Sequence, residues 1–198
     1  MFLPINLLID KPIVIFGYGL VGMRKAKFLS KLGFPVITID SKKKEADLKK
    51  EITKDNFVTY LEEKPPLVIV AFGADDHLSK EIALYCKNHG ILVNVVDRPK
   101  ISTVIFSSIL NHSDLSISIS TQGNCPFYAK QLRKELTPFV EKKSSWLQVL
   151  TILRRKASDP KNELKKIYEY PEFQLLLEKE NFDEALYLGQ QILSGVVK

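Results

Sequence analysis

Short apolar runs recur through the first half of the chain, separated by segments with helical periodicity. Residues 12–16 (PIVIF), 35–40 (PVITID), 67–72 (LVIVAF) and 91–96 (ILVNVV) consist mostly of apolar, often β-branched residues. Runs of this kind predict short strands that are buried on both faces. Because helices cover both sides of such strands, the pattern favours a parallel sheet.

Two of the intervening segments predict amphipathic helices. After the first run, apolar residues recur at near-helical spacing and stop before Gly33, a residue type that commonly ends helices. After the third run, Asp76 is a suitable N-cap, and an apolar stripe continues to the neighbourhood of Gly90. The order of strands and helices therefore predicts an α/β fold, with helices on both faces of a parallel sheet.

The pattern changes after about residue 100. Residues 114–121 (DLSISIST) alternate apolar and hydroxyl side chains, which predicts a strand with one face exposed or turned toward a partner. The edge of such a strand is available for pairing with another chain. Residues 126–143 predict a helix, and the spacing from residue 144 onward is helical, with breaks at Pro160 and Pro171.

Composition and charge narrow the class of protein. The chain has 198 residues, of which 45% are hydrophobic and 26% charged, as in ordinary globular proteins. Its formal net charge is +6, from 29 basic and 23 acidic residues. This charge is compatible with a generally basic surface or with a polyanionic partner, such as nucleic acid, an anionic membrane or a small acidic substrate.

Cysteine usage and hydropathy predict a soluble cytoplasmic protein. Cys86 and Cys125 are too few for a disulfide framework, and no Cys/His cluster has the spacing of a zinc site. No apolar run approaches the roughly 20 residues that span a bilayer. Residues 1–10 lack the basic start of a signal peptide.

Three glycines follow the first apolar run, in the sequence GYGLVG at residues 17–22. A GxGxxG motif alone is weak evidence, but this one joins a predicted strand to a predicted helix, and Asp40 ends the next strand. In a Rossmann-type site the glycines allow a tight turn, the approach of a pyrophosphate and close packing of helix on strand. The predicted cofactor-binding residues are Gly17, Gly19, Leu20, Val21, Gly22, Asp40 and Ser41.

Asp40 favours NAD over NADP as the cofactor. A carboxylate at this position accepts hydrogen bonds from the adenosine ribose and repels a 2′-phosphate. The lysines at residues 42–44 weaken this preference, because they could bind that phosphate. The alternative interpretation of the glycines is a turn in an α/β protein that binds no cofactor.

The residues alone do not identify a reaction. The sequence contains no HExxH motif, no Walker loop and no Ser/His/Asp order, and its three histidines are scattered. Asp97 follows the fourth predicted strand, at the sheet edge where ligands of open α/β folds collect. A carboxylate there could accept a proton. On the residues alone, however, a role for Asp97 as a turn residue or strand-end cap is preferred.

A combination of motifs nevertheless resembles the precorrin-2 dehydrogenase family, which includes dehydrogenase/ferrochelatases and the N-terminal module of siroheme synthase. The resemblance runs from about residue 2 to residue 143. Besides the glycine loop, the motifs that carry it are GADD at 73–76, NVVD at 94–97, FSSI at 106–109 and LSISISTQGNCP at 115–126.

The resemblance implies an NAD-dependent oxidation of precorrin-2 to sirohydrochlorin, on the route to sirohaem or related tetrapyrroles. Some family members also insert ferrous or cobalt ion into the product. With the resemblance, Asp97 becomes the expected catalytic residue. Further expected cofactor-binding residues are Gly73, Ala74 and Asp75, and the expected substrate-binding residues are Asn94, Ser120, Gly123, Cys125, Lys130 and Arg133.

The family's substrate carries eight carboxylates, which gives the basic residues a possible partner. Lys130 and Arg133 follow a predicted helix start at Cys125, whose dipole also favours an anion. The alternative is that they form a solvated helix face. At Cys125 the family usually has serine, which some members phosphorylate; a thiol there could bind metal or be oxidised, or could be a tolerated near-isostere.

Three parts of the chain are predicted from these observations: an NAD-binding Rossmann domain at residues 1–110, a dimerisation and substrate-cleft segment at 111–143, and a helical C-terminal domain at 144–198. The resemblance implies a homodimer formed through residues 100–143, in agreement with the one-sided strand. We expect neither nucleic acid nor a membrane as a partner. The alternative function is a non-catalytic Rossmann protein that senses NAD(H) or carries a tetrapyrrole.

Overall fold

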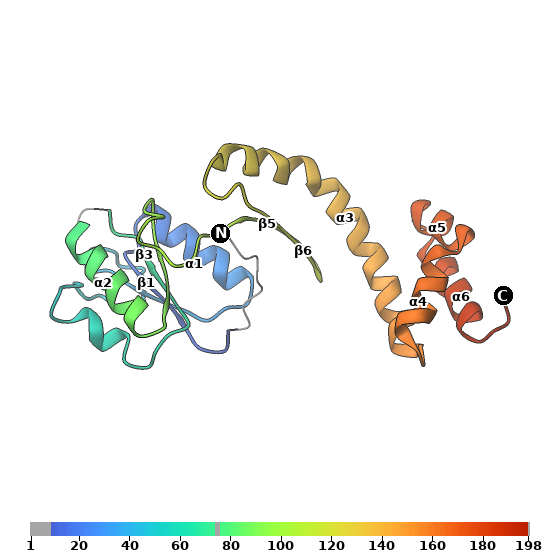
Figure 1. Ribbon diagram of the computed structural model, residues 1–198, viewed down its shortest axis with the longest axis horizontal. Coiled ribbons are helices and arrows are strands. Elements are labelled where there is room, and N and C mark those ends of the chain that lie inside the picture. The colour runs from blue at the N-terminus through green and yellow to red at the C-terminus, as the bar shows by residue number, and fades with distance from the viewer. Residues whose placement is uncertain (1–8, 74–75, 198) are drawn as a thin grey trace. The chain divides into compact units, whose positions relative to one another are not determined.

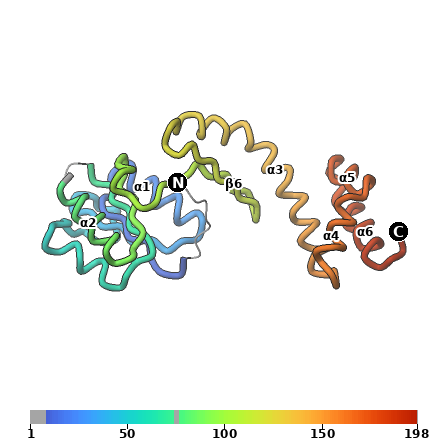
Figure 2. The backbone as a smooth tube through the Cα atoms, in the orientation of Figure 1, coloured from blue at the N-terminus to red at the C-terminus, as the bar shows by residue number. Residues whose placement is uncertain are grey.

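The chain divides into two compact units, Met1–Phe106 and Ser107–Lys198. The computed structural model describes residues 9–73 and 76–197, and each unit is considered by itself (Figures 1 and 2). The predicted division into three parts stays a prediction. Among the described residues, no helix combines the length and the apolarity needed to cross a bilayer.

The first unit is built on a parallel sheet, as predicted. Its four strands pair in the order β2-β1-β3-β4, and every pair is parallel. The strands are β1 (Ile13–Phe16), β2 (Val36–Ile39), β3 (Leu67–Val70) and β4 (Leu92–Val95). Two helices accompany them, α1 (Leu20–Lys31) and α2 (Asp76–Asn88).

The two faces of the sheet pack against different helices, which explains why the strands are apolar throughout. On one face, alternate residues such as Ile13 and Ile15 pack with Ala26 and Leu29 of α1. On the other face, Val14 and Phe16, together with residues of β3 and β4, pack with the buried side chains of α2. Figure 1 shows the strands between these helices, and the prediction of helices on both faces is confirmed.

The connection from β2 to β3 contains no α-helix and is held by local contacts. Its only helical turn is η1 (Phe57–Tyr60), a 3₁₀-helix that buries Phe57. Near its start, the Asp47 carboxylate accepts hydrogen bonds from the backbone N–H and the hydroxyl of Thr38, at 2.8 and 2.7 Å. These bonds fasten the connection to the edge strand of the sheet.

The second unit begins with an antiparallel hairpin. Strand β5 (Ser108–His112) pairs with β6 (Leu115–Ile119), and His112 lies opposite Leu115. The burial of β6 alternates between half-buried and exposed residues, which confirms the predicted one-sided strand. The hairpin packs on α3 (Pro126–Lys156), where the Ser144 hydroxyl donates to the His112 carbonyl at 3.1 Å.

Helix α3 continues without interruption past residue 143, where the sequence suggested a boundary. Figure 2 shows it leading from the hairpin to the C-terminal helices. These are α4 (Pro160–Glu169), α5 (Pro171–Glu178) and α6 (Phe182–Leu193). Prolines begin α4 and α5, as the sequence predicted, because a first-turn residue needs no N–H. Gly189 of α6 leaves room for the side chain of Leu153, since a Cβ there would lie 2.5 Å from a leucine methyl.

A core of seven buried residues holds the helices together. They come from α3, α4, α5 and α6: Trp146, Val149, Leu153, Ile167, Phe173, Leu177 and Ala185. Phe173 is completely buried, whereas Leu175 on the same helix is 52% exposed.

We predict that Phe173→Ala lowers the free energy of unfolding by about 3–5 kcal/mol, because it removes a buried ring and leaves a cavity. Leu175→Ala should change it by less than about 0.5 kcal/mol. Urea denaturation followed by the fluorescence of Trp146, the only tryptophan and part of the same core, measures both effects. Equal losses for the two variants would contradict the assignment of this core.

Candidate functional site

The first and third glycines of the loop permit close packing between β1, β3 and α1. Gly17 follows β1 with φ +93°, and a Cβ on it would lie 2.8 Å from the Phe72 nitrogen. A Cβ on Gly22 would collide with the Gly17 carbonyl. Both collisions involve backbone atoms, which cannot turn aside as a side chain can. The loop therefore needs glycine at Gly17 for its conformation and at Gly22 for close helix packing.

The second glycine faces open space at the start of α1. Gly19 is the N-cap residue of this helix, and no side chain caps the helix there. A Cβ on Gly19 would have no neighbour within 4 Å. The first N–H groups of α1, including those of Leu20 and Val21, are thus presented at an open surface, where the helix dipole favours an anion. This cradle fits the pyrophosphate of a dinucleotide.

Asp40 links the end of β2 to the glycine loop. Its carboxylate accepts the backbone N–H of Tyr18 at 2.7 Å and that of Lys42 at 2.8 Å. Partial burial acts to raise the pKa of Asp40, but N–H donation by Tyr18, Lys42 and Lys43 outweighs it and holds the pKa below its usual value. Asp40 is therefore ionised at neutral pH, beside the loop and next to exposed Ser41.

The connection after β3 lies next to the glycine loop, because β1 and β3 are neighbours. The Ala71 N–H donates to the Phe16 carbonyl at 2.7 Å. Gly73, the first predicted cofactor residue of this connection, is exposed. The other two, Ala74 and Asp75, lie outside the described residues.

Asn94 and Asp97 occupy different environments at the end of β4. Asn94 is only 7% exposed, and its amide nitrogen donates to the Val104 carbonyl at 3.0 Å. Its amide oxygen has no hydrogen-bond partner among the described residues. Asp97 is exposed in the following turn, with φ +60°. This left-handed conformation is uncommon for residues other than glycine, and such strain occurs preferentially at functional sites.

The remaining predicted substrate residues all belong to the second unit. Ser120 and Gly123 lie in the connection from β6 to α3, where the Ser120 hydroxyl accepts the Gln122 N–H at 3.1 Å. Cys125 is the exposed N-cap of α3, and its thiol makes no capping hydrogen bond. Lys130 is exposed on α3 and Arg133 is half-buried.

Lys25 is a basic residue of α1 that the motif analysis missed. It is half-buried, and its Nζ lies 4.0 Å from the centroid of the Phe106 ring. Burial and, to a smaller extent, the Arg24 charge lower the pKa of Lys25 to about 8, and the Asp97 charge partly opposes them. The signal in the sequence was its position four residues after Val21 and four before Leu29, on the apolar stripe of the helix.

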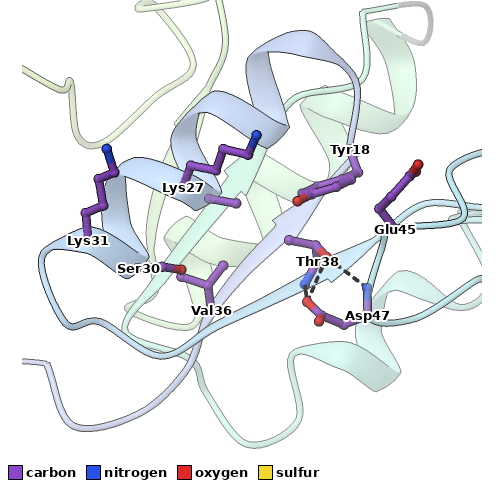
Figure 3. Close-up of a pocket in the computed structure, with 9 residues that line it drawn as sticks. Tyr18, Lys27, Ser30, Lys31, Val36, Thr38, Glu45 and Asp47 are labelled. Atoms are coloured by element: carbon purple, nitrogen blue, oxygen red, sulfur yellow. Dashed lines mark hydrogen bonds between the residues drawn. The ribbon is translucent and has the colours of Figure 1, made fainter.

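An open cavity of about 340 Å³ lies between α1 and β2, next to the glycine loop (Figure 3). Tyr18 borders it, together with side chains of both charges, including Lys27, Lys31 and Glu45. Thr38 and Asp47 also line it, and Figure 3 shows the hydrogen bonds between them. None of the predicted site residues lines it. This mixture of charges does not indicate a particular ligand.

A parallel sheet, a glycine turn into an uncapped helix and a carboxylate after the next strand together define a dinucleotide-binding protein of the Rossmann class. A comparison with known families agrees with this class. The chain belongs to the family of putative NAD(P)-binding domains, whose model matches residues 7–108.

Curated relatives extend the similarity beyond this domain. A siroheme synthase of Ruthia magnifica is 32% identical over 143 residues, which are 68% of this chain and 30% of that protein. A siroheme synthase of Blochmanniella floridana is 28% identical over 191 residues, 89% of this chain and 41% of the relative. The chain thus spans less than half the length of these relatives.

A solved structure shares the fold across both units. The structure named SirC, precorrin-2 dehydrogenase, matches with a TM-score of 0.70 and covers 94% of this chain and 99% of that one. The sequence identity is 17%, so this likeness establishes the architecture.

The glycine loop provides a matched pair of variants. We predict that Gly17→Ala lowers the free energy of unfolding by about 2 kcal/mol or more, because alanine is strained at this φ and its Cβ meets backbone. Gly19→Ala should leave stability within about 0.5 kcal/mol but weaken NADH binding at least about tenfold, because the methyl fills the anion cradle. Urea denaturation followed by circular dichroism, and NADH fluorescence titration, test both. Wild-type NADH affinity in Gly19→Ala would refute the cradle.

The lowered pKa of Lys25 predicts an unusual dependence of stability on pH. The folded chain holds the Lys25 proton with a pKa of about 8 and the unfolded chain with its ordinary 10.5. Between these values the unfolded state binds more protons than the folded state, so the contribution of Lys25 to the free energy of unfolding rises with pH. Below pH 8 the folded state bears the full destabilisation caused by the buried ammonium.

Lys25→Met should therefore raise the free energy of unfolding at pH 7 by about 1–2 kcal/mol, after allowance for solvent screening. The gain should shrink above pH 8 and vanish near the ordinary pKa of 10.5. Urea denaturation by circular dichroism at several pH values measures this difference. Lys27→Met, which removes an exposed charge from the same helix, is the control and should show no such trend. A destabilised Lys25→Met variant at pH 7 would contradict the prediction.

Proposed function

We propose that this protein is an NAD-dependent dehydrogenase that oxidises precorrin-2 to sirohydrochlorin in the biosynthesis of sirohaem. The observation that carries the proposal is the combination, at the carboxyl edge of one sheet, of an anion-binding glycine loop, ionised Asp40 and exposed, strained Asp97. The siroheme synthases among the relatives and the solved precorrin-2 dehydrogenase support the choice of substrate.

The cofactor would be held by residues from three connections of the first unit. The glycine loop, with the N–H groups of Leu20 and Val21, would bind the pyrophosphate, and Asp40 with Ser41 would bind the adenosine ribose. Gly73, Ala74 and Asp75 remain predicted contacts from the connection after β3. When bound, NAD supplies the acceptor for a hydride.

Asp97 would handle the proton of the reaction. Oxidation of precorrin-2 to sirohydrochlorin removes two hydrogens from the substrate, one as a hydride and one as a proton. Asp97 would accept that proton, and its exposure in the turn after β4, with φ +60°, supports this role.

Cationic and polar groups of the second unit would bind the substrate. Lys130 and Arg133 on α3 offer positive charges to carboxylates, and the uncapped α3 N-terminus at Cys125 favours the same kind of group. Ser120 and Gly123 belong to the connection that precedes this terminus. Asn94 stays a predicted substrate contact, although its burial and its bond to Val104 also give it a structural role.

Assembly, location and metal insertion complete the proposal. We propose a homodimer, supported by the exposed alternate residues of β6, and a cytoplasmic location, supported by two free cysteines.

Insertion of ferrous or cobalt ion into sirohydrochlorin stays a prediction of the family resemblance. The absence of nucleic-acid and membrane partners also stays a prediction. The alternative function, sensing NAD(H) or carrying a tetrapyrrole without catalysis, is separated by the following assay.

Purified protein is incubated with precorrin-2 and NAD, and the formation of NADH and of the sirohydrochlorin spectrum is followed. We expect turnover by the wild type and a loss in kcat on the order of 100-fold or more in Asp97→Asn, because a positioned proton acceptor contributes this much. NADH binding should be unchanged in this variant. Asp55→Asn, which removes an exposed carboxylate elsewhere in the first unit, is the matched control and should keep wild-type kcat.

The outcomes separate the two functions. NADH binding without turnover would favour the sensing or carrying protein. Absence of NADH binding would refute the dehydrogenase and the NAD(H) sensor, and would leave only a tetrapyrrole carrier. Wild-type turnover in Asp97→Asn would leave the dehydrogenase standing and refute the role of Asp97.

A further inference from the structure

The carboxylate proposed to accept the substrate proton belongs to a tight turn. The Arg98 N–H donates to the Val95 carbonyl at 3.1 Å, which closes a four-residue turn at the end of β4. Asp97 is the third residue of this turn and has φ +60°. A positive φ at this position favours glycine or asparagine, so the aspartate is held there at a cost in backbone strain. The direction of the Asp97 side chain therefore depends on what keeps the turn closed.

After this turn the chain returns along the open side of β4. Because β4 is an edge strand that pairs only with β3, the backbone groups on its other side need partners. The Thr103 and Val104 N–H groups donate to the Val93 carbonyl at 2.8 and 3.2 Å. Two hydroxyls accept the N–H groups of the strand. The Val93 N–H donates to the Thr103 hydroxyl at 2.7 Å, and the Val95 N–H donates to the Ser102 hydroxyl at 2.9 Å.

The Ser102 hydroxyl reaches both ends of the turn. Besides accepting the Val95 N–H, it donates to the Arg98 carbonyl at 2.9 Å, whereas the Val95 carbonyl is a more distant acceptor at 3.3 Å. One hydroxyl can make both bonds, because it has two lone pairs and one proton. Val95 and Arg98 are the first and last residues of the turn that carries Asp97. Ser102 thus ties these two residues together from outside the turn.

We propose that Ser102 is a positioning residue for Asp97. Its half-buried hydroxyl joins the two ends of the turn and thereby fixes the direction in which the carboxylate leaves the backbone. The proposal rests on the dehydrogenase function proposed above, because it gives Ser102 a part in the same proton transfer. In this role Ser102 acts through the turn and contacts neither the substrate nor the cofactor.

The alternative is that Ser102 only covers the open side of β4, which would make it equivalent to Thr103. The Thr103 hydroxyl bonds to the N–H and the carbonyl of Val93, at 2.7 and 3.4 Å. Val93 lies two residues before the turn begins, so Thr103 fastens the same connection without spanning the turn. Removal of either hydroxyl leaves one N–H of β4 without its hydroxyl partner. Thr103 is therefore a matched control for a change at Ser102.

The first test needs no substrate. Exchange of the Arg98 backbone N–H, followed by NMR, reports whether the turn is closed. Ser102→Ala should speed this exchange about threefold to tenfold, because it removes the hydrogen bonds that tie the turn ends. Thr103→Val should speed the exchange of the Val93 N–H and leave that of Arg98 unchanged. Wild-type exchange of the Arg98 N–H in Ser102→Ala would overturn the proposal.

The second test is kinetic, with precorrin-2 and NAD. Ser102→Ala should lower kcat about tenfold or more, because a small displacement of a catalytic group costs this much. The KM for NAD and the NADH affinity should be unchanged. Ser102→Thr keeps the hydroxyl and should restore kcat to within about threefold, and Ser102→Cys, with its weak hydrogen bonding, should fall between. Thr103→Val should keep wild-type kcat. Equal kcat losses in Ser102→Ala and Thr103→Val, or a loss confined to KM, would overturn the positioning role.

A double-mutant cycle shows whether Ser102 acts through Asp97. In the Asp97→Asn background, Ser102→Ala should change the remaining kcat by less than about twofold, because residues that act as a unit have non-additive effects. The same relative loss in both backgrounds would mean that Ser102 acts independently of the carboxylate, and would refute the proposal.

The tests also separate this proposal from the function on which it rests. Faster Arg98 exchange in Ser102→Ala, with a wild type that does not oxidise precorrin-2, would refute the dehydrogenase and leave the hold of Ser102 on the turn standing. Oxidation of precorrin-2 by the wild type, with wild-type kcat in Ser102→Ala, would keep the dehydrogenase and refute the positioning role.

Discussion

The close approach of α1 to the β1 turn is the constraint on which the rest of the candidate site depends. It is possible because Gly17 and Gly22 carry no side chain where a Cβ would meet backbone atoms. This contact directs the N-terminus of α1 to the carboxyl edge of the sheet. It also brings the Tyr18 N–H to the Asp40 carboxylate and places the Lys25 ammonium over the ring of Phe106. A larger distance between α1 and the β1 turn would separate these groups, so the two glycines also set the position of Asp40 relative to the loop.

The sequence predicted those parts of the fold that depend on local patterns. Near-continuous apolar runs identified all four parallel strands of the described part of the chain, and the placement of the cofactor at the glycine loop stays a prediction. The sequence did not reveal the lowered pKa of Lys25, because this shift comes mainly from burial, which exists only after α1 packs on the sheet. The division at residue 143 stays a prediction, and α3 runs through this position. Ser144 is buried there and its hydroxyl donates to the His112 carbonyl, a contact between distant residues that the sequence pattern does not reveal.

Several features that cost stability lie at the carboxyl edge of the parallel sheet. Lys25 is partly desolvated, Asp97 has a left-handed backbone, and Gly19 leaves the first turn of α1 without a side-chain cap. Such features are not confined to this edge, because Lys64, Ser113, Gln122 and Glu180 also have positive φ, and α5 and α6 begin without a side-chain cap. Backbone strain therefore supports the candidate site only together with the glycine loop and Asp40.

The helix termini support the same interpretation through their charges. Helices α4, α5 and α6 each have an acidic residue in the first turn, which offsets the positive end of the helix dipole, whereas α1 and α3 have none. Neither α1 nor α3 has a side-chain cap, and each carries cations within its first three turns, Lys25 and Lys130 among them. An uncompensated positive terminus is unfavourable for an isolated helix and favourable beside a bound anion. Cations of α1 and α3 thus lie near the two termini where pyrophosphate and substrate carboxylates are proposed to bind.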